Sequence, residues 1–197
     1  MASGIERFRA AAEELGVPVE PVRYPAGTRT AADAAAAVGC DVGQIVKSLV
    51  FATLTRLVLA LTSGANQVDT DLLGELAGEE IRLAEPEAVR AATGFAIGGT
   101  PPFGHLGPLP VWIDEDLLAY DTVWAAAGTP DSCFPIAPAQ LVAVTGATPA
   151  DFVQRQERGH MGRWLVENMP SGLDLELPDR NEPDREIPFV GDDEVPG

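Results

Sequence analysis

The feature that most constrains the fold is a pair of apolar segments, residues 45–53 and 56–62, with only two residues between them. Segments of this length with a short connection are typical of an antiparallel β-hairpin. The only lysine of the chain, Lys47, lies inside the first segment. In a strand its side chain would share one face with those of Ile45, Leu49 and Phe51. An ammonium group in such surroundings is unfavourable unless a partner compensates it.

Three interpretations of Lys47 follow from these residues. It is a functional cation, a charge that protects an edge strand from aggregation, or a side chain whose aliphatic stem is buried while its ammonium reaches solvent. A second feature bears on this choice, the loop over residues 98–105. It contains three glycines, two prolines and a histidine.

The loop begins with Gly98 and Gly99, and glycines permit a positive φ and a close approach of the main chain to a ligand. Pro101 and Pro102 then stiffen its exit. A loop of this kind can present main-chain N–H groups to an oxyanion. It can also be only a turn.

Helix signals alternate irregularly with strand signals along the chain. Capping boxes at Ser3 and Thr30 predict two helices, which end near Gly16 and Gly39. Further helices are predicted from Asp69 or Thr70 to Leu76, between Pro86 and Gly94, for one turn at 138–141, and from Thr148–Pro149 onward. Further strands are predicted at 81–84, 95–97, 111–113, 122–126, 133–136 and 142–144. The fold class expected is α+β, a single domain with a mixed β-sheet flanked by helices.

Composition excludes several classes of function. A net charge of −17 argues against a broad nucleic-acid-binding face, although one or two cations suffice to hold the end of a nucleic acid. No apolar stretch of ~18 residues predicts a membrane span, and no secretory signal is evident. Cys40 and Cys133 form no CxxC pair, so a reduced, cytoplasmic protein is expected. His105 and His160 lack metal-ligand spacing, so neither a metal nor another cofactor is predicted.

The C-terminal segment differs from the rest of the chain. Residues 171–197 contain nine acidic residues, two arginines and four prolines. Few large apolar residues remain there to offset the entropy lost on ordering. We therefore predict an acidic tail that is disordered or wraps around the domain.

A longer string is more specific than the loop alone. Residues 93–105 read TGFAIGGTPPFGH, and further segments match in the same order at 30–35, 44–51, 111–118, 127–128 and 134–141. Together they resemble the YbaK/EbsC family of prolyl-tRNA synthetase-associated editing domains. The resemblance covers residues 5–152. It divides the chain into a deacylase domain (1–152), a C-terminal helical extension (153–170) and the acidic tail (171–197).

The resemblance implies both a fold and an activity. The family fold is a mixed α+β domain with a cleft beside its central sheet. Family members hydrolyse, in trans, the ester between a wrong amino acid and the 3′-terminal adenosine of a tRNA. The expected partner is therefore the 3′ CCA end of a tRNA with its attached amino acid. An aminoacyl-tRNA synthetase is a second candidate partner.

The resemblance also assigns roles to residues. The family lysine, matched by Lys47, contacts the acylated adenosine or its phosphate. The family Gly-x-x-x-Pro loop, matched by residues 98–102, positions the scissile carbonyl through main-chain groups. Some members use a hydroxyl or thiol of the substrate in place of a protein base. An ester is already activated, so positioning and oxyanion stabilisation can supply much of the rate.

The candidate catalytic residues are therefore Lys47, Gly98 and Gly99. The candidate substrate-binding residues are Thr30, Asn66, Asp69, Thr100, Pro101, Pro102, His105 and Cys133. Structural roles compete at several of these positions: helix or turn caps at Thr30, Asn66 and Asp69, a main-chain contact at His105, and core packing at Cys133. Asp114 is expected to cap a turn or to pair with Lys47.

Two other functions are compatible with the same residues. A non-catalytic module could use the cleft to bind a nucleotide or an aminoacyl-nucleotide. An interaction protein could act through the acidic tail. Measured deacylation of mischarged tRNA would separate the enzyme from both.

Overall fold

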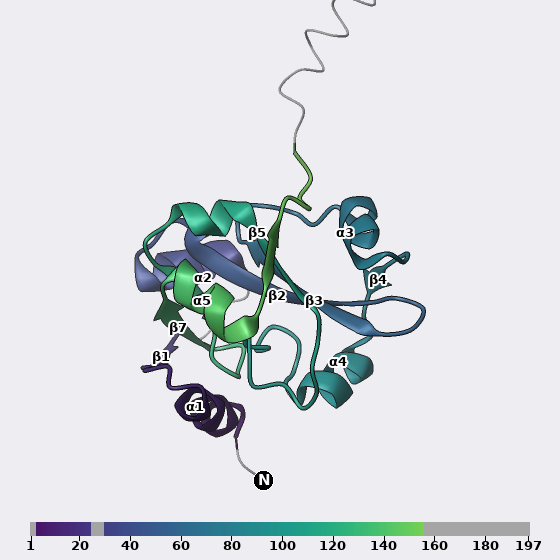
Figure 1. Cartoon of the computed structure of the whole chain (residues 1–197). Coiled ribbons are helices and arrows are strands. Elements are labelled where there is room, and N and C mark those ends of the chain that lie inside the picture. The colour runs from purple at the N-terminus through teal and green to yellow at the C-terminus, as the bar shows by residue number, and fades with distance from the viewer. Residues whose placement is uncertain (1–2, 25–29, 156–197) are drawn as a thin grey trace, which may run out of the picture. The chain divides into compact units, whose positions relative to one another are not determined.

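The computed structural model describes residues 3–24 and 30–155. These residues form an eight-stranded mixed sheet with the strand order β1-β7-β6-β2-β3-β5-β8, and β4 pairs additionally with β2. Figure 1 shows the long β2–β3 pair at the centre, with helices around it. The predicted α+β class with a single mixed sheet is confirmed.

The helices are α1 (Gly4–Glu14), α2 (Ala31–Val38), α3 (Thr70–Ala77), α4 (Pro86–Thr93) and α5 (Pro138–Thr145), with 3-10 helices η1 (Val42–Gln44) and η2 (Glu115–Ala119). The strands are β1 (Val22–Arg23), β2 (Ile45–Ala52), β3 (Leu57–Ser63), β4 (Arg82–Leu83), β5 (Val111–Asp114), β6 (Val123–Ala126), β7 (Ser132–Ile136) and β8 (Thr148–Ala150).

The predicted hairpin is the centre of the sheet. Strands β2 and β3 pair in antiparallel register from Val46 opposite Ser63 to Ala52 opposite Leu57. The first residues of β2 pair in parallel with β6, and its last residues pair with β4. In the strand order β2 lies between β6 and β3, so Lys47 is not on an outermost strand of the sheet, where a guarding charge is expected.

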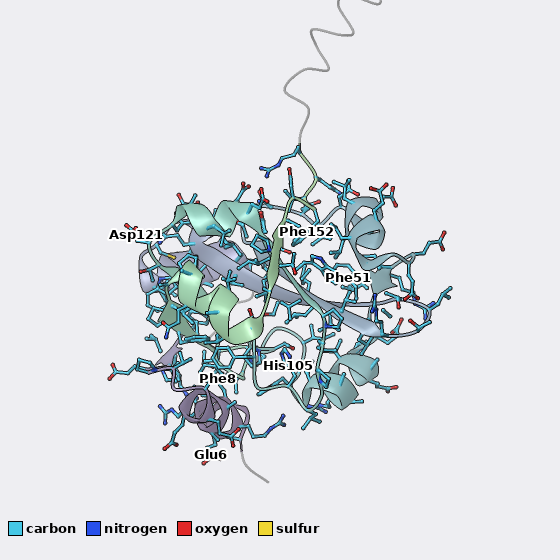
Figure 2. The ribbon with its side chains drawn as sticks, in the orientation of Figure 1. Glu6, Phe8, Phe51, His105, Asp121 and Phe152 are labelled. Atoms are coloured by element: carbon cyan, nitrogen blue, oxygen red, sulfur yellow. The ribbon has the colours of Figure 1, made fainter. Side chains whose placement is uncertain are left out.

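The two faces of the sheet support separate cores because side chains alternate along each strand. Val46 and Val50 of β2 join a large cluster with Phe8 of α1 and Leu141 of α5. Phe51 faces the other way and packs in a second cluster with the residues Val58, Ala60, Leu73 and Phe152. Figure 2 shows Phe8 well apart from Phe51 and Phe152. Lys47 lies on the face of Phe51, as predicted.

The helix-boundary signals are confirmed at the caps. Ser3 and Thr30 each form a complete capping box, with Glu6 and Asp33 respectively. The side chain of Asp69 caps α3 by accepting from two main-chain N–H groups. Gly39, Gly94 and two other glycines end their helices in the left-handed conformation, which glycine adopts most readily.

Three predicted elements are wrong. Residues 95–97 form no strand but lead into a turn. Residues 142–144 belong to α5, which continues beyond the single turn predicted at 138–141 and ends at Gly146. The helix expected from Thr148 is instead the strand β8, which pairs with β5. Proline is compatible with such an outer strand because only one side of it is hydrogen-bonded.

The predicted extension (153–170) and acidic tail (171–197) lie outside the described residues, except for 153–155. Within those three, Val153 forms an antiparallel bridge with Val68. None of the helices in the described ranges is long and apolar enough to cross a membrane.

Candidate active site

A cavity of about 470 Å³ lies where the sheet separates along one edge of β2. Strand β6 pairs with Ile45 and Val46, whereas β4 pairs with Phe51 and Ala52. The residues between these two pairings line the cavity. The remaining walls come from the residue after β1, from α2, from the segment that runs from β4 through α4 to the glycine loop, and from β6, β7 and their connection. They include Tyr24, Thr30, Ala31, Ala34, Leu83, Ala84, Val89, Ile97, Gly98, Thr100, Trp124, Ala126, Pro130 and Ser132.

Lys47 lines this cavity and is half-buried. Its ammonium donates a hydrogen bond to the main-chain oxygen of Asn66. Burial lowers the pKa of Lys47 because it disfavours the charged form, and the negative charge of Asp114 partly opposes this effect. The lysine is thus a cation held by a neutral acceptor, at the wall of a largely apolar cavity.

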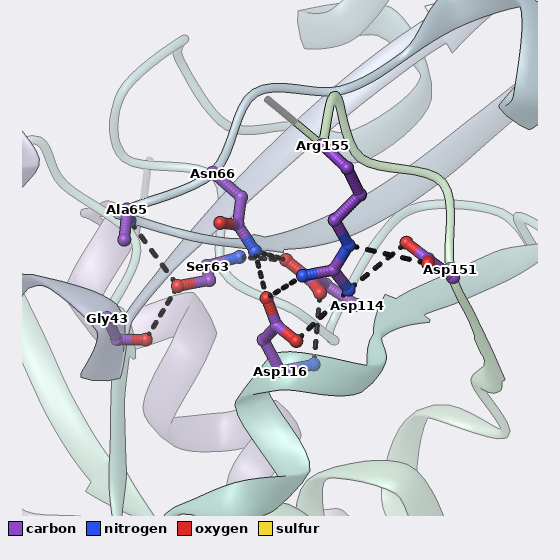
Figure 3. Close-up of polar contacts among 8 residues, drawn as sticks. All are labelled: Gly43, Ser63, Ala65, Asn66, Asp114, Asp116, Asp151 and Arg155. Atoms are coloured by element: carbon purple, nitrogen blue, oxygen red, sulfur yellow. Dashed lines mark hydrogen bonds and ion pairs between the residues drawn. The ribbon is translucent and has the colours of Figure 1, made fainter. Parts of the chain in front are cut away.

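The position of that acceptor depends on a group of carboxylates (Figure 3). The side-chain amide of Asn66 donates to Asp114 at 2.8 Å and to Asp116 at 2.7 Å. Asp114 is fully buried and also accepts from the main-chain N–H groups of Ser63 and Asp116. Asp114 therefore caps η2, as expected, and also fixes the loop from which Asn66 presents its oxygen to Lys47.

Arg155 completes this network from the C-terminal side. Its guanidinium binds both carboxylate oxygens of Asp116, at 2.8 and 3.1 Å, and pairs with Asp151. The hydrogen bonds from Arg155 and Asn66 lower the pKa of Asp116, so this carboxylate remains ionised. We call Asn66, Asp114, Asp116 and Arg155 the polar anchor.

The glycine loop forms part of another wall of the cavity. The N–H of Gly99 donates to the carbonyl of Ala96 at 3.0 Å, and Gly98 has a φ of +82°. A positive φ at the third position of a four-residue turn is the signature of a type II turn, which favours glycine there. The N–H of Gly99 is therefore used within the turn. No described residue accepts from the N–H of Gly98 or Thr100, and both residues line the cavity.

The loop is held at both ends. At its entrance Arg7 donates to the carbonyl of Gly94 at 2.5 Å and stacks on Phe95, 4.5 Å from the ring centroid. At its exit the Nε2 atom of His105 contacts the carbonyl of Pro101 at 2.8 Å. Burial lowers the pKa of His105, and the residue is absent from the cavity wall.

Only some of the other predicted site residues line the cavity. Thr30 caps α2 and also lines the cavity. Asn66 and Asp69 do not line the cavity. Asn66 belongs to the polar anchor, and Asp69 caps the start of α3. Pro101 and Pro102 are buried behind the turn. Cys133 is fully buried outside the cavity wall and interacts with the phenol of Tyr24, whose pKa is raised mainly by burial.

Sequence reasoning missed most of the apolar wall. Alanines and valines carry no local chemical signal, so Ala31, Ala34 and Val89 could be assigned only by the fold. Ser48 was the detectable omission because it follows Lys47 directly. The hydroxyl groups of Ser48 and Thr62 are both buried, and neither has a hydrogen-bond partner among the described residues.

The described residues contain no group of three His, Cys, Asp or Glu side chains that could hold a metal ion. The titratable side chains in the cavity wall are those of Lys47 and Tyr24. The site can therefore offer one ammonium, hydroxyl groups and main-chain donors and acceptors. These groups suit the positioning of a polarised carbonyl better than proton abstraction by a carboxylate or an imidazole.

Comparison with known proteins agrees with this geometry. The profile of the aminoacyl-tRNA editing domain family matches residues 25–144. The crystal structure of a candidate trans-editing enzyme for prolyl tRNA synthetase is 49% identical, with a TM-score of 0.76, and the match covers 79% of this chain and 99% of that one. An uncharacterised protein of Bacillus subtilis, YwhH, is 29% identical over 60% of this chain and 76% of its own length.

A proline–tRNA ligase of Solidesulfovibrio magneticus is 34% identical over 59% of this chain, but the match spans only 19% of the ligase. The similarity thus concerns one domain of that enzyme. The family match, the structural match and the cavity beside β2 agree with one another, and the chain belongs to the aminoacyl-tRNA editing domain family.

Proposed function

We propose that the protein hydrolyses the ester bond of mischarged aminoacyl-tRNA, acting in trans. The observation that carries this proposal is the placement of Lys47 and the Gly98 turn in the walls of one cavity. Water adds to the ester carbonyl, and the tetrahedral intermediate collapses with departure of the ribose oxygen, which takes up a proton. The products are the free amino acid and a tRNA with an intact 3′-terminal adenosine.

Each wall has a role in this reaction. Lys47 holds the acylated adenosine or its phosphate through its ammonium. The N–H groups of Gly98 and Thr100 are the available donors for the oxyanion, because that of Gly99 is used within the turn. One well-placed donor contributes ~3 kcal/mol of transition-state stabilisation. A hydroxyl or thiol of the substrate can assist where the protein offers no base.

The acidic surface limits how the tRNA is held. A chain with a net charge of −17 repels a polyanion over most of its surface. Recognition therefore centres on the CCA end and its amino acid, and a synthetase partner supplies the remaining affinity. Such a substrate places the protein in the cytoplasm.

The experiment is a deacylation assay on a panel of proline tRNAs and other tRNAs, each charged with a different amino acid. Hydrolysis of at least one mischarged species, faster than that of the correctly charged one, is expected. Lys47→Ala serves as the inactive control, with a melting curve to show that it is folded. Absence of hydrolysis across the panel would contradict the proposal.

The second candidate is a non-catalytic module that binds a nucleotide or aminoacyl-nucleotide. One observation favours it: no His, Asp or Glu of the described chain lines the cavity. Binding of charged CCA minihelices without any turnover would support this alternative.

A further inference from the structure

The main-chain groups of β2 point in alternating directions, and this can be deduced from two hydrogen bonds at its ends. The carbonyl of Ile45 accepts from Gly64 at 2.7 Å, and the N–H of Thr53 donates to Arg56 at 2.8 Å. In an antiparallel ladder, alternate residues exchange both of their hydrogen bonds with the partner strand. The odd-numbered residues of β2 therefore face β3, and the even-numbered ones face the opposite edge.

That opposite edge is only partly covered. Val46 is paired with β6, opposite Ala125. The carbonyl of Val50 accepts from Ala84 at 3.0 Å. Between these contacts, the N–H and C=O of Ser48 and the N–H of Val50 have no partner among the described residues. Both residues line the cavity, so these three groups form a free edge along its floor.

Apolar side chains lie on both faces of the sheet beside this free edge. Ala34 of α2 belongs to the core cluster on one face, together with Ile45. Val89 of α4 belongs to the cluster on the other face, and both residues line the cavity. A ligand hydrogen-bonded to the free edge would lie in the plane of the sheet, between these two walls. This arrangement favours a flat ring.

We propose that the free edge binds the adenine base of the substrate's terminal nucleotide; this inference rests on the function proposed above. The 6-amino group of adenine donates to the carbonyl of Ser48. The neighbouring ring nitrogen, N1 or N7, accepts from the N–H of Val50. The carbonyl of one residue and the N–H of the second residue after it lie side by side on a strand edge, which matches a donor next to an acceptor on the base.

Hypoxanthine provides the sharpest contrast. Its O6 replaces the amino group, so two acceptors would face each other at the carbonyl of Ser48. Such a mismatch leaves a buried polar group unpaired. A good two-point contact of this kind discriminates by about tenfold or more.

The first test is a nucleotide titration of the ¹⁵N-labelled full-length protein. AMP is expected to bind at least ~10-fold more tightly than IMP and to shift the amide signals of Ser48 and Val50. The amide of Leu59, which donates to Pro110 at 2.9 Å on the far side of β3, is the control and should not move. Equal affinities for AMP and IMP, an unmoved Val50 amide, or failure of AMP to bind at millimolar concentration would overturn the inference. So would tighter binding of CMP, whose base carries the same donor–acceptor pattern.

The second test separates this inference from the proposed function. Two minihelices carry the same amino acid, one ending in adenosine and the other in inosine. The inosine substrate is expected to lose about tenfold in kcat/KM, through KM. Equal hydrolysis of both would overturn the adenine contact and leave the deacylase proposal standing. If neither is hydrolysed with any amino acid of the panel, the deacylase proposal fails, and the AMP–IMP comparison alone decides the adenine contact.

Discussion

The two sides of Lys47 differ in how their polar groups are satisfied. On one side, in the polar anchor, the carboxylate oxygens of Asp114 and Asp116 and the side-chain amide of Asn66 all have hydrogen-bond partners. On the other, the free edge of Ser48 and Val50 and the turn at Gly98 leave main-chain groups without partners in the described structure. Buried polar groups are normally paired. We infer that the first side holds Lys47 in place, and under the proposed function the unpaired groups of the second side bind the substrate.

The largest effect on the deacylation rate is expected when the cation between the two sides is removed. Lys47→Ala should lower kcat/KM by at least ~100-fold, while the melting temperature changes little because a half-buried charge is lost along with its desolvation cost. Wild-type rates in the folded variant would refute the role of Lys47. Arg9→Ala, at an exposed cation of α1, is the matched control.

The same lysine predicts a pH dependence. Burial lowers its pKa, so the ammonium is lost at a lower pH than for an ordinary lysine. If the charged form is needed, the deacylation rate should fall with rising pH, starting below the usual titration range of lysine. A rate profile corrected for spontaneous ester hydrolysis, recorded beside Lys47→Arg, tests this. An arginine stays charged, so any activity left in that variant should lack the decline.

The polar anchor should contribute to stability as well as to positioning. Asp114→Ala removes the acceptor for the main chain of Ser63 and for the side chain of Asn66. Unpaired buried donors should lower the free energy of unfolding by about 2 kcal/mol. Denaturant unfolding measures this, with Asp71→Ala on the exposed surface of α3 as the control. Equal stability of the two variants would show that the anchor is dispensable.

Alanine substitutions at the adjacent glycines Gly98 and Gly99 test the side on which main-chain groups are unpaired. At Gly98 an added methyl group would lie 3.7 Å from Pro130, an ordinary contact, so Gly98→Ala carries mainly the strain of a positive φ, about 1 kcal/mol. At Gly99 the methyl group would lie 2.6 Å from the main chain of Thr129. Gly99→Ala should therefore lower the melting temperature more strongly.

If the turn acts on the substrate, the rate of Gly98→Ala should fall at least ~10-fold at a temperature where the variant is fully folded. If the glycines only shape a turn, rate and folded fraction would decline together in both variants. Parallel measurement of kcat/KM and melting curves decides between these outcomes.

The smallest expected effect concerns His105. Burial lowers its pKa in the folded state, so the unfolded chain binds a proton first as the pH falls. The stability should therefore decrease as the pH falls through the unfolded pKa of about 6.5, until the folded state also protonates. His105→Gln should lack this part of the pH dependence. Identical slopes of unfolding free energy against pH for the two proteins would contradict the assignment.

Local signals in the sequence determined much of the framework. The hairpin over 45–62, the capping boxes at Ser3 and Thr30 and the glycine stop at Gly94 depend on neighbouring residues, so they could be recognised without the fold. The family resemblance came from segments of the same kind. Lys47 stood out because an ammonium in an apolar strand is rare, whatever surrounds it.

The tertiary structure decided what those segments do together. Strand β8 exists because β5 provides its partner, and no local signal distinguished it from a helix start. The partner of Lys47 is a main-chain oxygen from a distant loop, whose position depends on carboxylates about fifty residues further along. The free edge of β2 arises because β4 and β6 cover only its ends. Main-chain hydrogen bonds are the same for every residue type, so only the fold shows which of them are left unpaired.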